Sequence, residues 1–210
     1  MPNFDPDCQR CPRLASFLAD VKSEHPNYHA APVAPFGSDP ARLLIVGLAP
    51  GMHGANATGR PFTGDYAGVL LYQTLHKFGF ANQPVAEHID DGLVLQDCRI
   101  TNAVKCLPPQ NKPVGAEIRQ CNDFLRSELD GQQAGSVILA LGRIAHDAVL
   151  RARGLRNADY AFAHGSLHGL PGDLHLLSSY HCSRYNTQTR RLTTEMFEEV
   201  FSVARRLLDG

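Results

Sequence analysis

Short apolar runs that alternate with stretches of helical spacing are the feature that most limits the fold of this chain. Three mostly apolar runs are short enough to be buried strands: Leu43–Val46, Val137–Leu141 and Leu174–Ser178. Arg99–Val104, within RITNAVKC, is expected to be the second strand in chain order. The helical spacings are at Leu14–Val21, Val69–Phe78, Ala116–Leu129, Ile144–Arg151 and Leu192–Leu208. Strands separated by helices pair in parallel, with helices on both faces. The sequence therefore predicts a three-layer α/β/α fold with a central, mainly parallel four-stranded sheet.

A long glycine-rich loop, Gly47–Gly68, follows the first expected strand and precedes a helical pattern. Open α/β sheets bind ligands at the carboxyl ends of their strands, and glycines let the backbone approach a ligand closely. The loop carries one aromatic ring (Phe62), one carboxylate (Asp65), one imidazole (His53) and one amide (Asn56). A stacking ring beside an acid suits a flat base better than a phosphate.

Two further strand ends carry polar side chains. Asn102 ends the second strand, and His181 follows the fourth. Alone, such an Asn or Asp is usually a cap, and such a His is usually a surface residue. In a parallel sheet these ends share one rim, so Phe62, Asp65, Asn102 and His181 can converge on one pocket. Its chemistry would combine stacking, amide pairing, a carboxylate and an imidazole.

Length and composition set only broad limits. The chain has 210 residues and is 43% hydrophobic, which suits one sizeable domain spanning residues 1–210. No apolar run approaches the length of a membrane span, and no signal-like apolar stretch opens the chain. A cytoplasmic protein is the default expectation.

Charge neither indicates nor excludes a nucleic-acid partner. The formal net charge is −1, although a local basic face would suffice for binding. From charge alone, the arginine clusters are expected to be two ordinary solvated faces: Arg143, Arg151, Arg153 and Arg156, and then Arg184, Arg190 and Arg191.

Six cysteines are present, and four of them could form one site. Cys8 and Cys11 form a CxxC pair near the N-terminus, while Cys106 and Cys121 belong to one strand–helix unit. Four thiolates suit zinc or an iron–sulfur cluster. Unrelated buried thiols and a redox pair remain open, whereas disulfides are not expected in a cytosolic chain. Of the other two cysteines, Cys98 is expected to be a small core residue. Cys182 adjoins His181, so it is either a reactive thiol or, as is more common, a packed core residue.

Several of these motifs together resemble the uracil-DNA glycosylase superfamily, most closely its iron–sulfur-containing type B branch, also called family five. The resemblance covers nearly the whole chain. It rests on the CxxC pair, GLAPGMHGANATGRPFTGD, TNAVKCLPPQNKP, ALGRIAHDAVL, FAHG and YHCSRYNTQTRRLT. The first long motif and the final one are highly specific. Gly47–Gly51 reads GLAPG, whereas family four usually has an acidic residue there.

The resemblance implies a cofactor. In that family, cysteines matching Cys8, Cys11, Cys106 and Cys121 ligate a 4Fe–4S cluster. The cluster is taken as structural rather than catalytic. Here it would close the N-terminal cysteine hook onto the domain.

The resemblance also implies roles at the expected pocket. Phe62 would stack on a flipped base, and Asn102 would hydrogen-bond the pairing edge of that base. His181 would stabilise the departing base, while Asp65 would activate or orient water, unless it only caps a helix. From the same loop, three more residues are expected to contact substrate: His53, Gly54 and Asn56.

A loop after the histidine would enter the duplex and fill the hole that the base leaves. Its expected DNA-binding residues are Ser183, Arg184, Tyr185, Arg190 and Arg191. Tyr185 is an attractive side chain to fill that hole, and Arg184 an attractive groove or phosphate contact. Cys182 stands where the family usually has Pro, which would have fixed the local φ angle.

The function that follows from the resemblance is a monofunctional DNA glycosylase that excises uracil and initiates base excision repair. Hypoxanthine and ethenocytosine are expected as further substrates, and double-stranded DNA is the expected partner of a monomer acting at the nucleoid. One alternative is a non-catalytic iron–sulfur protein that binds nucleic acid or senses redox state. Another is a covalent uracil-DNA binder, although the basic insertion of that offshoot is not found here.

Overall fold

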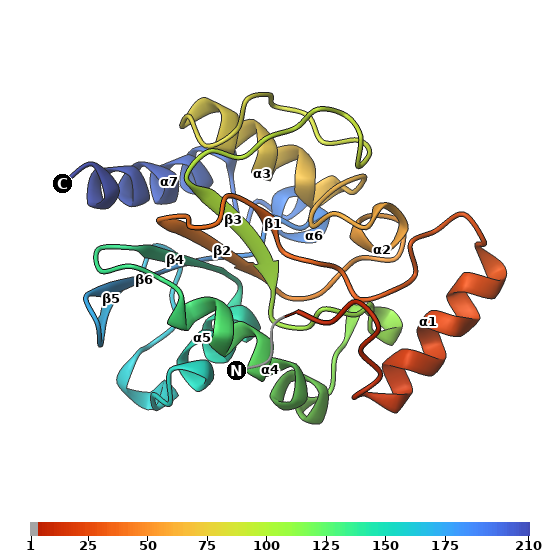
Figure 1. The fold of residues 1–210 in the computed structure, drawn as a ribbon. Helices are drawn as coiled ribbons and strands as arrows, with labels where there is room; N and C mark the ends of the chain where they lie inside the picture. The colour runs from red at the N-terminus through yellow and green to blue at the C-terminus, as the bar shows by residue number, and fades with distance from the viewer. Residues whose placement is uncertain (1–3) are drawn as a thin grey trace.

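A six-stranded sheet forms the centre of the computed structural model, which describes residues 4–210 (Figure 1). The strands run in the order β1-β3-β2-β4-β6-β5. Their bounds are β1 Phe36–Gly37, β2 Leu43–Gly47, β3 Cys98–Asn102, β4 Val137–Leu141, β5 Leu167–Leu170 and β6 Leu174–Ser179. The four inner strands β3, β2, β4 and β6 are parallel, and the two edge strands pair antiparallel.

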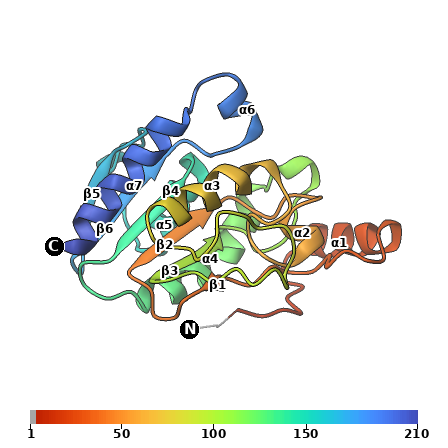
Figure 2. The same ribbon diagram turned by 90° about the horizontal axis from the view of Figure 1, so that it is seen from above.

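Helices cover both faces of the sheet. The α-helices are α1 Pro12–Glu24, α2 Ala55–Thr58, α3 Tyr66–Lys77, α4 Gly115–Asp130, α5 Arg143–Ala152, α6 Arg184–Gln188 and α7 Thr194–Asp209. Two 3₁₀ turns are η1 Pro109–Asn111 and η2 Asn157–Asp159. Helices α3 and α7 lie on one face and α4 and α5 on the other, while α1 and α6 lie at the periphery (Figures 1 and 2). Within residues 4–210, no helix combines the length and the apolar character of a membrane span.

Strand β2 shows why the inner strands form a two-sided core. Leu43 and Ile45 belong to the apolar cluster under α3 and α7, while Leu44 and Val46 belong to the cluster under α4 and α5. Successive side chains of a strand point to opposite faces, so a strand covered on both sides is apolar throughout. Burying each such side chain contributes about 1.5–3 kcal/mol.

The predicted α/β/α layering and the four parallel strands are confirmed, but the sheet has two more strands than expected. β1 is only two residues long. β5 contains a glycine, and only its last residue is buried. Neither segment is a continuous apolar run, and β1 is also too short to be predicted. Both are edge strands of the sheet, and each hydrogen-bonds to a neighbouring strand on one side only.

The N-terminal segment packs beside the carboxyl end of β3. A third apolar cluster joins Leu14, Leu18 and Val21 of α1 to Val104 and Phe124. This contact brings the chain before α1 close to α4 and to the loop after β3. Elements far apart in sequence are thus fixed against one another.

Strand β2 also determines where a ligand can bind. Its two parallel neighbours, β3 and β4, lie on opposite sides of it. The connections from the carboxyl ends therefore diverge, and open α/β sheets bind ligands in the resulting crevice. The loops after β2, β3 and β6 all leave the sheet at this edge.

Candidate active site

A pocket of about 340 Å³ opens at the carboxyl edge of the sheet. All four side chains that the sequence predicts to converge line it: Phe62, Asp65, Asn102 and His181. The remaining lining residues are Leu48, Ala49, Gly51, Ala55, Ala67, Asn111 and Ser183. Asn111 was missed by the sequence analysis, because a lone Asn in a proline-rich loop carries no periodic signal. It reaches the pocket from η1 with a left-handed backbone (φ 56°).

Phe62 forms an apolar wall of this pocket in an unusual conformation. Its φ angle is +54°, and only 6% of the residue is exposed. A Cβ atom at Gly47 would lie 2.8 Å from the Phe62 ring and 2.4 Å from Oδ1 of Asn102. Glycine at the end of β2 is therefore required for both side chains to reach the pocket. Strained backbone of this kind persists only where its surroundings hold it.

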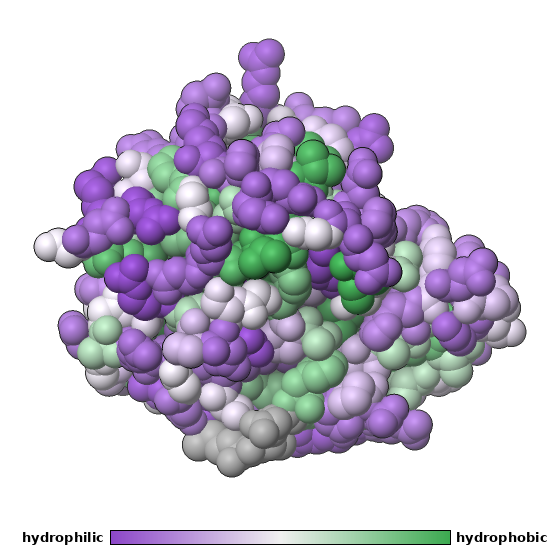
Figure 3. All heavy atoms as spheres, turned by 45° about the horizontal axis from the view of Figure 1, so that its top comes forward, coloured by the Kyte–Doolittle hydropathy of each residue, from purple (hydrophilic) through white to green (hydrophobic). Residues whose placement is uncertain are grey.

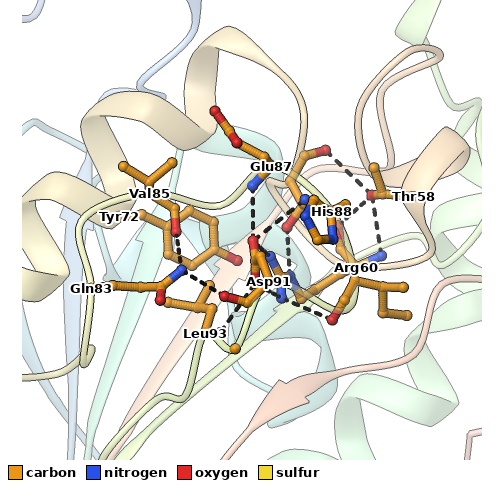
Figure 4. A network of polar contacts seen from close by, with 12 residues as sticks. Thr58, Arg60, Tyr72, Gln83, Val85, Glu87, His88, Asp91 and Leu93 are labelled. Carbon is orange, nitrogen blue, oxygen red and sulfur yellow. Dashed lines mark hydrogen bonds and ion pairs between the residues drawn. The ribbon is translucent and has the colours of Figure 1, made fainter.

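A buried ion pair lies beside this strained segment (Figure 4). The Arg60 guanidinium donates to both carboxylate oxygens of Asp91, at 2.8 and 2.6 Å, and both side chains are at most 9% exposed. Asp91 also accepts backbone N–H groups from Glu87 and Leu93. Hydrogen bonding from Arg60 holds the pKa of Asp91 well below its usual range. The loop around Asp91 is thereby tied to the glycine-rich loop.

The same network fixes the residues on either side of Phe62. Arg60 Nε donates to Thr63 Oγ1 at 2.8 Å, and Tyr72 Oη donates to the Pro61 carbonyl at 2.7 Å. Phe62 is thus held between two anchored neighbours. This arrangement explains how a bulky residue keeps a left-handed conformation.

Asp65 begins helix α3 as its N-cap. Oδ1 accepts the Gly68 N–H at 2.9 Å, while Oδ2 has no hydrogen bond among the described residues. A Cβ at Gly54 would lie 2.5 Å from Oδ2, so only glycine fits at position 54 beside this carboxylate. Burial raises the pKa of Asp65, and the N–H groups of Gly68 and Ala67 oppose that shift. One oxygen caps the helix, and the other is left for a ligand.

Asn102 presents an unsatisfied amide. The residue is 3% exposed, and its buried Oδ1 has no partner in the part of the chain that the structure describes. Leaving a buried acceptor unpaired costs about 1–3 kcal/mol. Because Asn102 also lines the pocket, this acceptor is available to a donor on a ligand.

His181 lies next to Phe62, with ring centroids 5.8 Å apart and planes 26° from parallel. Removal of the imidazole from water lowers the pKa of His181 to about 4. The ring is therefore neutral at pH 7, with one N–H donor. The His181 carbonyl accepts Asn186 Nδ2 at 2.8 Å, which ties this segment to α6.

Three residues predicted to contact substrate do not line the pocket. His53 is exposed, and its Nδ1 lies 2.9 Å from Tyr28 Oη. Asn56 is buried, and its Nδ2 donates to the Met52 carbonyl at 3.5 Å. Gly54 packs against Asp65, which lines the pocket, but is not itself a lining residue. Their contact with substrate stays a prediction.

The segment expected to enter DNA contains the short helix α6. Ser183 is its N-cap and also lines the pocket. Tyr185 is 71% exposed, and the Arg184 guanidinium lies 5.9 Å from the centre of the Tyr66 ring. Arg190 and Arg191, also expected to bind DNA, are exposed as well. The cationic and aromatic groups are free to meet a polyanion, which leaves the DNA-binding prediction standing.

A second, more open hollow of about 560 Å³ adjoins the pocket and shares Asp65 with it. Its rim includes three side chains that are roughly half exposed: Tyr66, Val69 and Val85. Figure 3 turns the α3 side towards the viewer and shows apolar patches among the polar side chains there. The surface around the pocket therefore offers apolar as well as charged contacts.

Four cysteines surround one small cavity between the N-terminal segment, the loop after β3 and α4: Cys8, Cys11, Cys106 and Cys121. The Lys105 backbone N–H donates to Cys121 Sγ at 3.3 Å. Burial raises the pKa of Cys106 to about 12 and that of Cys121 to about 11. Cys98 and Cys182 lie fully buried in the apolar core, as expected.

Comparison with known proteins assigns the family. A family profile described as "Uracil DNA glycosylase superfamily" matches residues 34–205. The chain belongs to the uracil-DNA glycosylase superfamily. The match includes every residue that lines the pocket. It begins after Cys8 and Cys11, so half of the cysteine set lies outside it.

Relatives within the uracil-DNA glycosylase superfamily cover most of the chain. A "Type-5 uracil-DNA glycosylase" of Thermus thermophilus is 47% identical over 205 residues, which are 95% of this chain and 93% of the relative. One from Pyrobaculum aerophilum is 42% identical over 198 residues, 92% and 86% of the two chains. One from Mycobacterium leprae is 40% identical over 210 residues, 95% and 91%. The resemblance to family five is confirmed.

Proposed function

We propose that this protein is a monofunctional DNA glycosylase, which hydrolyses the N-glycosidic bond of uracil in DNA and so initiates base excision repair. One observation carries the proposal: a single pocket holds an aromatic wall, an unsatisfied amide, a carboxylate and a neutral imidazole. Membership of the superfamily and the type-5 relatives support it.

Excision begins with rotation of the nucleotide out of the duplex, because a stacked base cannot be reached. Unstacking costs a few kcal/mol, and least at a mispair such as U opposite G. The exposed Tyr185 is suited to fill the hole, since a ring can replace part of the lost stacking. Arg184 and Arg190 would contact the backbone of the same duplex.

Recognition of the base follows from Phe62 and Asn102. Phe62 would stack on the flipped ring. Asn102 Oδ1 would accept the N3–H of uracil, which gives this buried acceptor a partner that the described residues do not supply. Cytosine carries an acceptor at N3, so it would leave that oxygen unsatisfied. Discrimination of this kind is strong because a buried polar group is otherwise left without a partner.

The chemical step breaks the bond between C1′ and N1, and the electron pair leaves with the base. A neutral His181 would donate its N–H to a base oxygen and stabilise the developing anion, an effect that typically contributes about 10²–10³ in rate. Asp65 Oδ2 would stabilise the cationic sugar and orient a water molecule. The water oxygen adds to C1′, and its proton passes to Asp65 or to solvent.

We further propose that Cys8, Cys11, Cys106 and Cys121 hold a 4Fe–4S cluster. Cysteine thiolates are the ligands of such a cluster, and all four of these cysteines line one small cavity. No group of three or more His, Cys, Asp or Glu side chains within residues 4–210 is arranged around a single ion. The N–H donated to Cys121 Sγ also suits a thiolate ligand. The cluster would supply a structural link and take no part in excision.

The substrate range is proposed to include hypoxanthine and ethenocytosine. Hypoxanthine has an N1–H that can replace the N3–H of uracil at Asn102, whereas ethenocytosine lacks such a donor and would depend on stacking against Phe62. Small residues supply much of the lining, among them Gly51, Ala55 and Ala67, and the pocket measures about 340 Å³. The test is release of free base from duplexes that carry uracil, hypoxanthine or ethenocytosine, measured by mass spectrometry. Release of uracil alone would restrict the range. Release of none, with tight binding to uracil-containing DNA, would favour a binder or sensor.

Two expectations about assembly and location remain proposals: a monomer bound to double-stranded DNA, acting in the cytoplasm at the nucleoid. Light scattering of the free protein and of its DNA complex measures the first. A mass of two chains per duplex would contradict it.

A further inference from the structure

One charged side chain is buried beside the four cysteines. Lys105 lines the same small cavity as Cys8, Cys11, Cys106 and Cys121, and only 2% of the residue is exposed. It precedes Cys106 in the chain, and its backbone N–H donates to Cys121 Sγ at 3.3 Å. A lysine is almost never fully buried unless its charge is paired. Groups close to the ammonium must therefore neutralise it.

Two of the described residues hold this ammonium in place. Nζ donates to Thr101 Oγ1 and, at 2.7 Å, to Glu128 Oε1. Thr101 belongs to β3 and Glu128 to α4, so the side chain of Lys105 joins these two elements. An ammonium has three N–H donors, and the described residues accept two of them. One donor is left for a further acceptor.

The ion pair between Lys105 and Glu128 is incomplete. The Glu128 side chain is 13% exposed, and its buried Oε2 has no hydrogen bond among residues 4–210. Burial raises the pKa of Cys121, and the charge of Lys105 opposes that rise. The ammonium therefore acts on charge at the cysteine cavity as well as on Glu128.

A second cation lines the cavity but is more exposed. Arg10 pairs with Asp123 at 2.7 Å, and the two side chains are 35% and 40% exposed. Water and salt screen exposed charges strongly, whereas a charge held away from water keeps much of its field. Of these two cations, Lys105 therefore has the stronger effect on charge inside the cavity.

We propose that Lys105 is the counter-charge of the proposed cluster and raises its reduction potential. Four thiolates outweigh the positive charge of a 4Fe–4S core, and one-electron reduction adds one more negative charge. A fixed cation favours the more negative state, since net charge and hydrogen bonds to the sulfurs set the potential of such clusters. Glu128 acts in the opposite direction, because it offsets the ammonium. The inference rests on the proposed cluster but not on uracil excision.

The test is a redox titration of the purified, iron-containing protein, followed by electron paramagnetic resonance. Lys105→Met removes the charge but keeps an unbranched side chain. It should lower the equilibrium constant for reduction about tenfold, which is about 59 mV for one electron. Glu128→Gln should raise the same constant. These signs hold for any one-electron couple of the cluster, because reduction always adds a negative charge.

Two further variants control for folding and for general charge effects. Lys105→Met combined with Glu128→Gln removes the whole buried pair, so this double variant leaves no uncompensated charge and should titrate close to wild type. Arg10→Gln removes one positive charge from the same cavity, and its shift should be smaller because Arg10 is partly exposed. Iron analysis of each variant shows whether the cluster is retained.

Shifts of the same sign in Lys105→Met and Glu128→Gln would overturn the proposal, because a structural disturbance alone would move both alike. So would an unchanged potential in iron-loaded Lys105→Met, or an equal shift in Arg10→Gln. Wild-type protein without iron would remove the cluster and, with it, this role of Lys105. The expected shifts in a protein that releases no uracil would support the role of Lys105 and contradict the proposed excision.

Discussion

At the residue scale, Asp65 combines two tasks in one carboxyl group. One oxygen caps α3 through Gly68 N–H, and the other lies at the base pocket without a protein partner among the described residues. The sequence predicted both tasks but could not separate them, because an acid before a helix has the same pattern in either case. Substitutions can separate them, since an amide caps a helix as well as a carboxylate does.

Asp65→Asn is expected to leave the stability of the protein nearly unchanged while uracil excision falls by about 10²-fold or more. Asp65→Ala should lose the same activity and also about 1 kcal/mol of stability, because the cap is removed. The measurements are single-turnover excision and denaturant unfolding of both variants. Full activity in Asp65→Asn would assign the residue to capping alone.

His181 gives a prediction about pH. Its pKa in the folded protein, about 4, lies below the ordinary value of 6.5, so the imidazole stays neutral between them. The single-turnover rate should therefore show no step near pH 6.5. Because only the unfolded chain takes up this proton in that window, the stability contributed by the neutral ring is present above pH 6.5. It is lost as the pH falls towards 4. NMR titration of the imidazole with a midpoint near 6.5 would contradict this account.

At the scale of elements, the inner strands and long helices followed from sequence periodicity, whereas the short ones did not. Strands β2 and β4 are apolar runs, β6 is partly apolar, and β3 mixes polar and apolar residues. The longer helices begin and end within a few residues of the expected bounds. The edge strands and the helices α2 and α6 are too short for a periodic signal, so tertiary contacts determine them. The ion pair between Arg60 and Asp91 could likewise not be predicted from the sequence, because the two residues are 31 positions apart.

That ion pair supports a prediction about the segment that carries Phe62. Asp91→Asn leaves the buried Arg60 charge uncompensated, so the free energy of unfolding should fall by about 3–5 kcal/mol. The Michaelis constant for uracil-containing DNA should rise as Phe62 loses its fixed position. Arg60→Lys should not preserve function, because an ammonium lacks the two parallel donors.

The matched control is Asp97→Asn. Asp97 also pairs with an arginine, Arg42, but both side chains are about a third exposed or more. An exposed pair contributes about 0–1 kcal/mol, so this variant should unfold close to wild type. Equal destabilisation by Asp91→Asn and Asp97→Asn would show that the buried pair has no special role.

At the scale of the whole molecule, convergence of distant segments was predictable, but side-chain direction was not. Parallel strand ends must share an edge, which is why Phe62, Asp65, Asn102 and His181 meet as expected. The directions of His53 and Asn56 depend on Tyr28 and on the turn at Met52, which no local pattern encodes. The cysteines also converge, because α1 packs against the end of β3 and against α4.

The cysteine set yields a prediction about iron and stability. The purified protein should contain four iron atoms and four sulfides per chain, and Cys121→Ser should lose iron together with thermal stability. Cys98→Ala is the control, since Cys98 is equally buried but lies in the apolar core. Iron analysis and thermal unfolding measure both. Iron retained by Cys121→Ser or lost from Cys98→Ala would contradict the assignment, as would zinc in place of iron.

If the pocket lined by His181 excises uracil from DNA, one substitution should abolish most of that activity. The most direct test is single-turnover cleavage of a duplex with one U·G mispair, treated with alkali or left untreated, by wild type and by His181→Ala. Wild type should cut the strand only after alkali, and His181→Ala should cut it about 10²–10³ times more slowly. Scission without alkali, or an unchanged rate in His181→Ala, would contradict it.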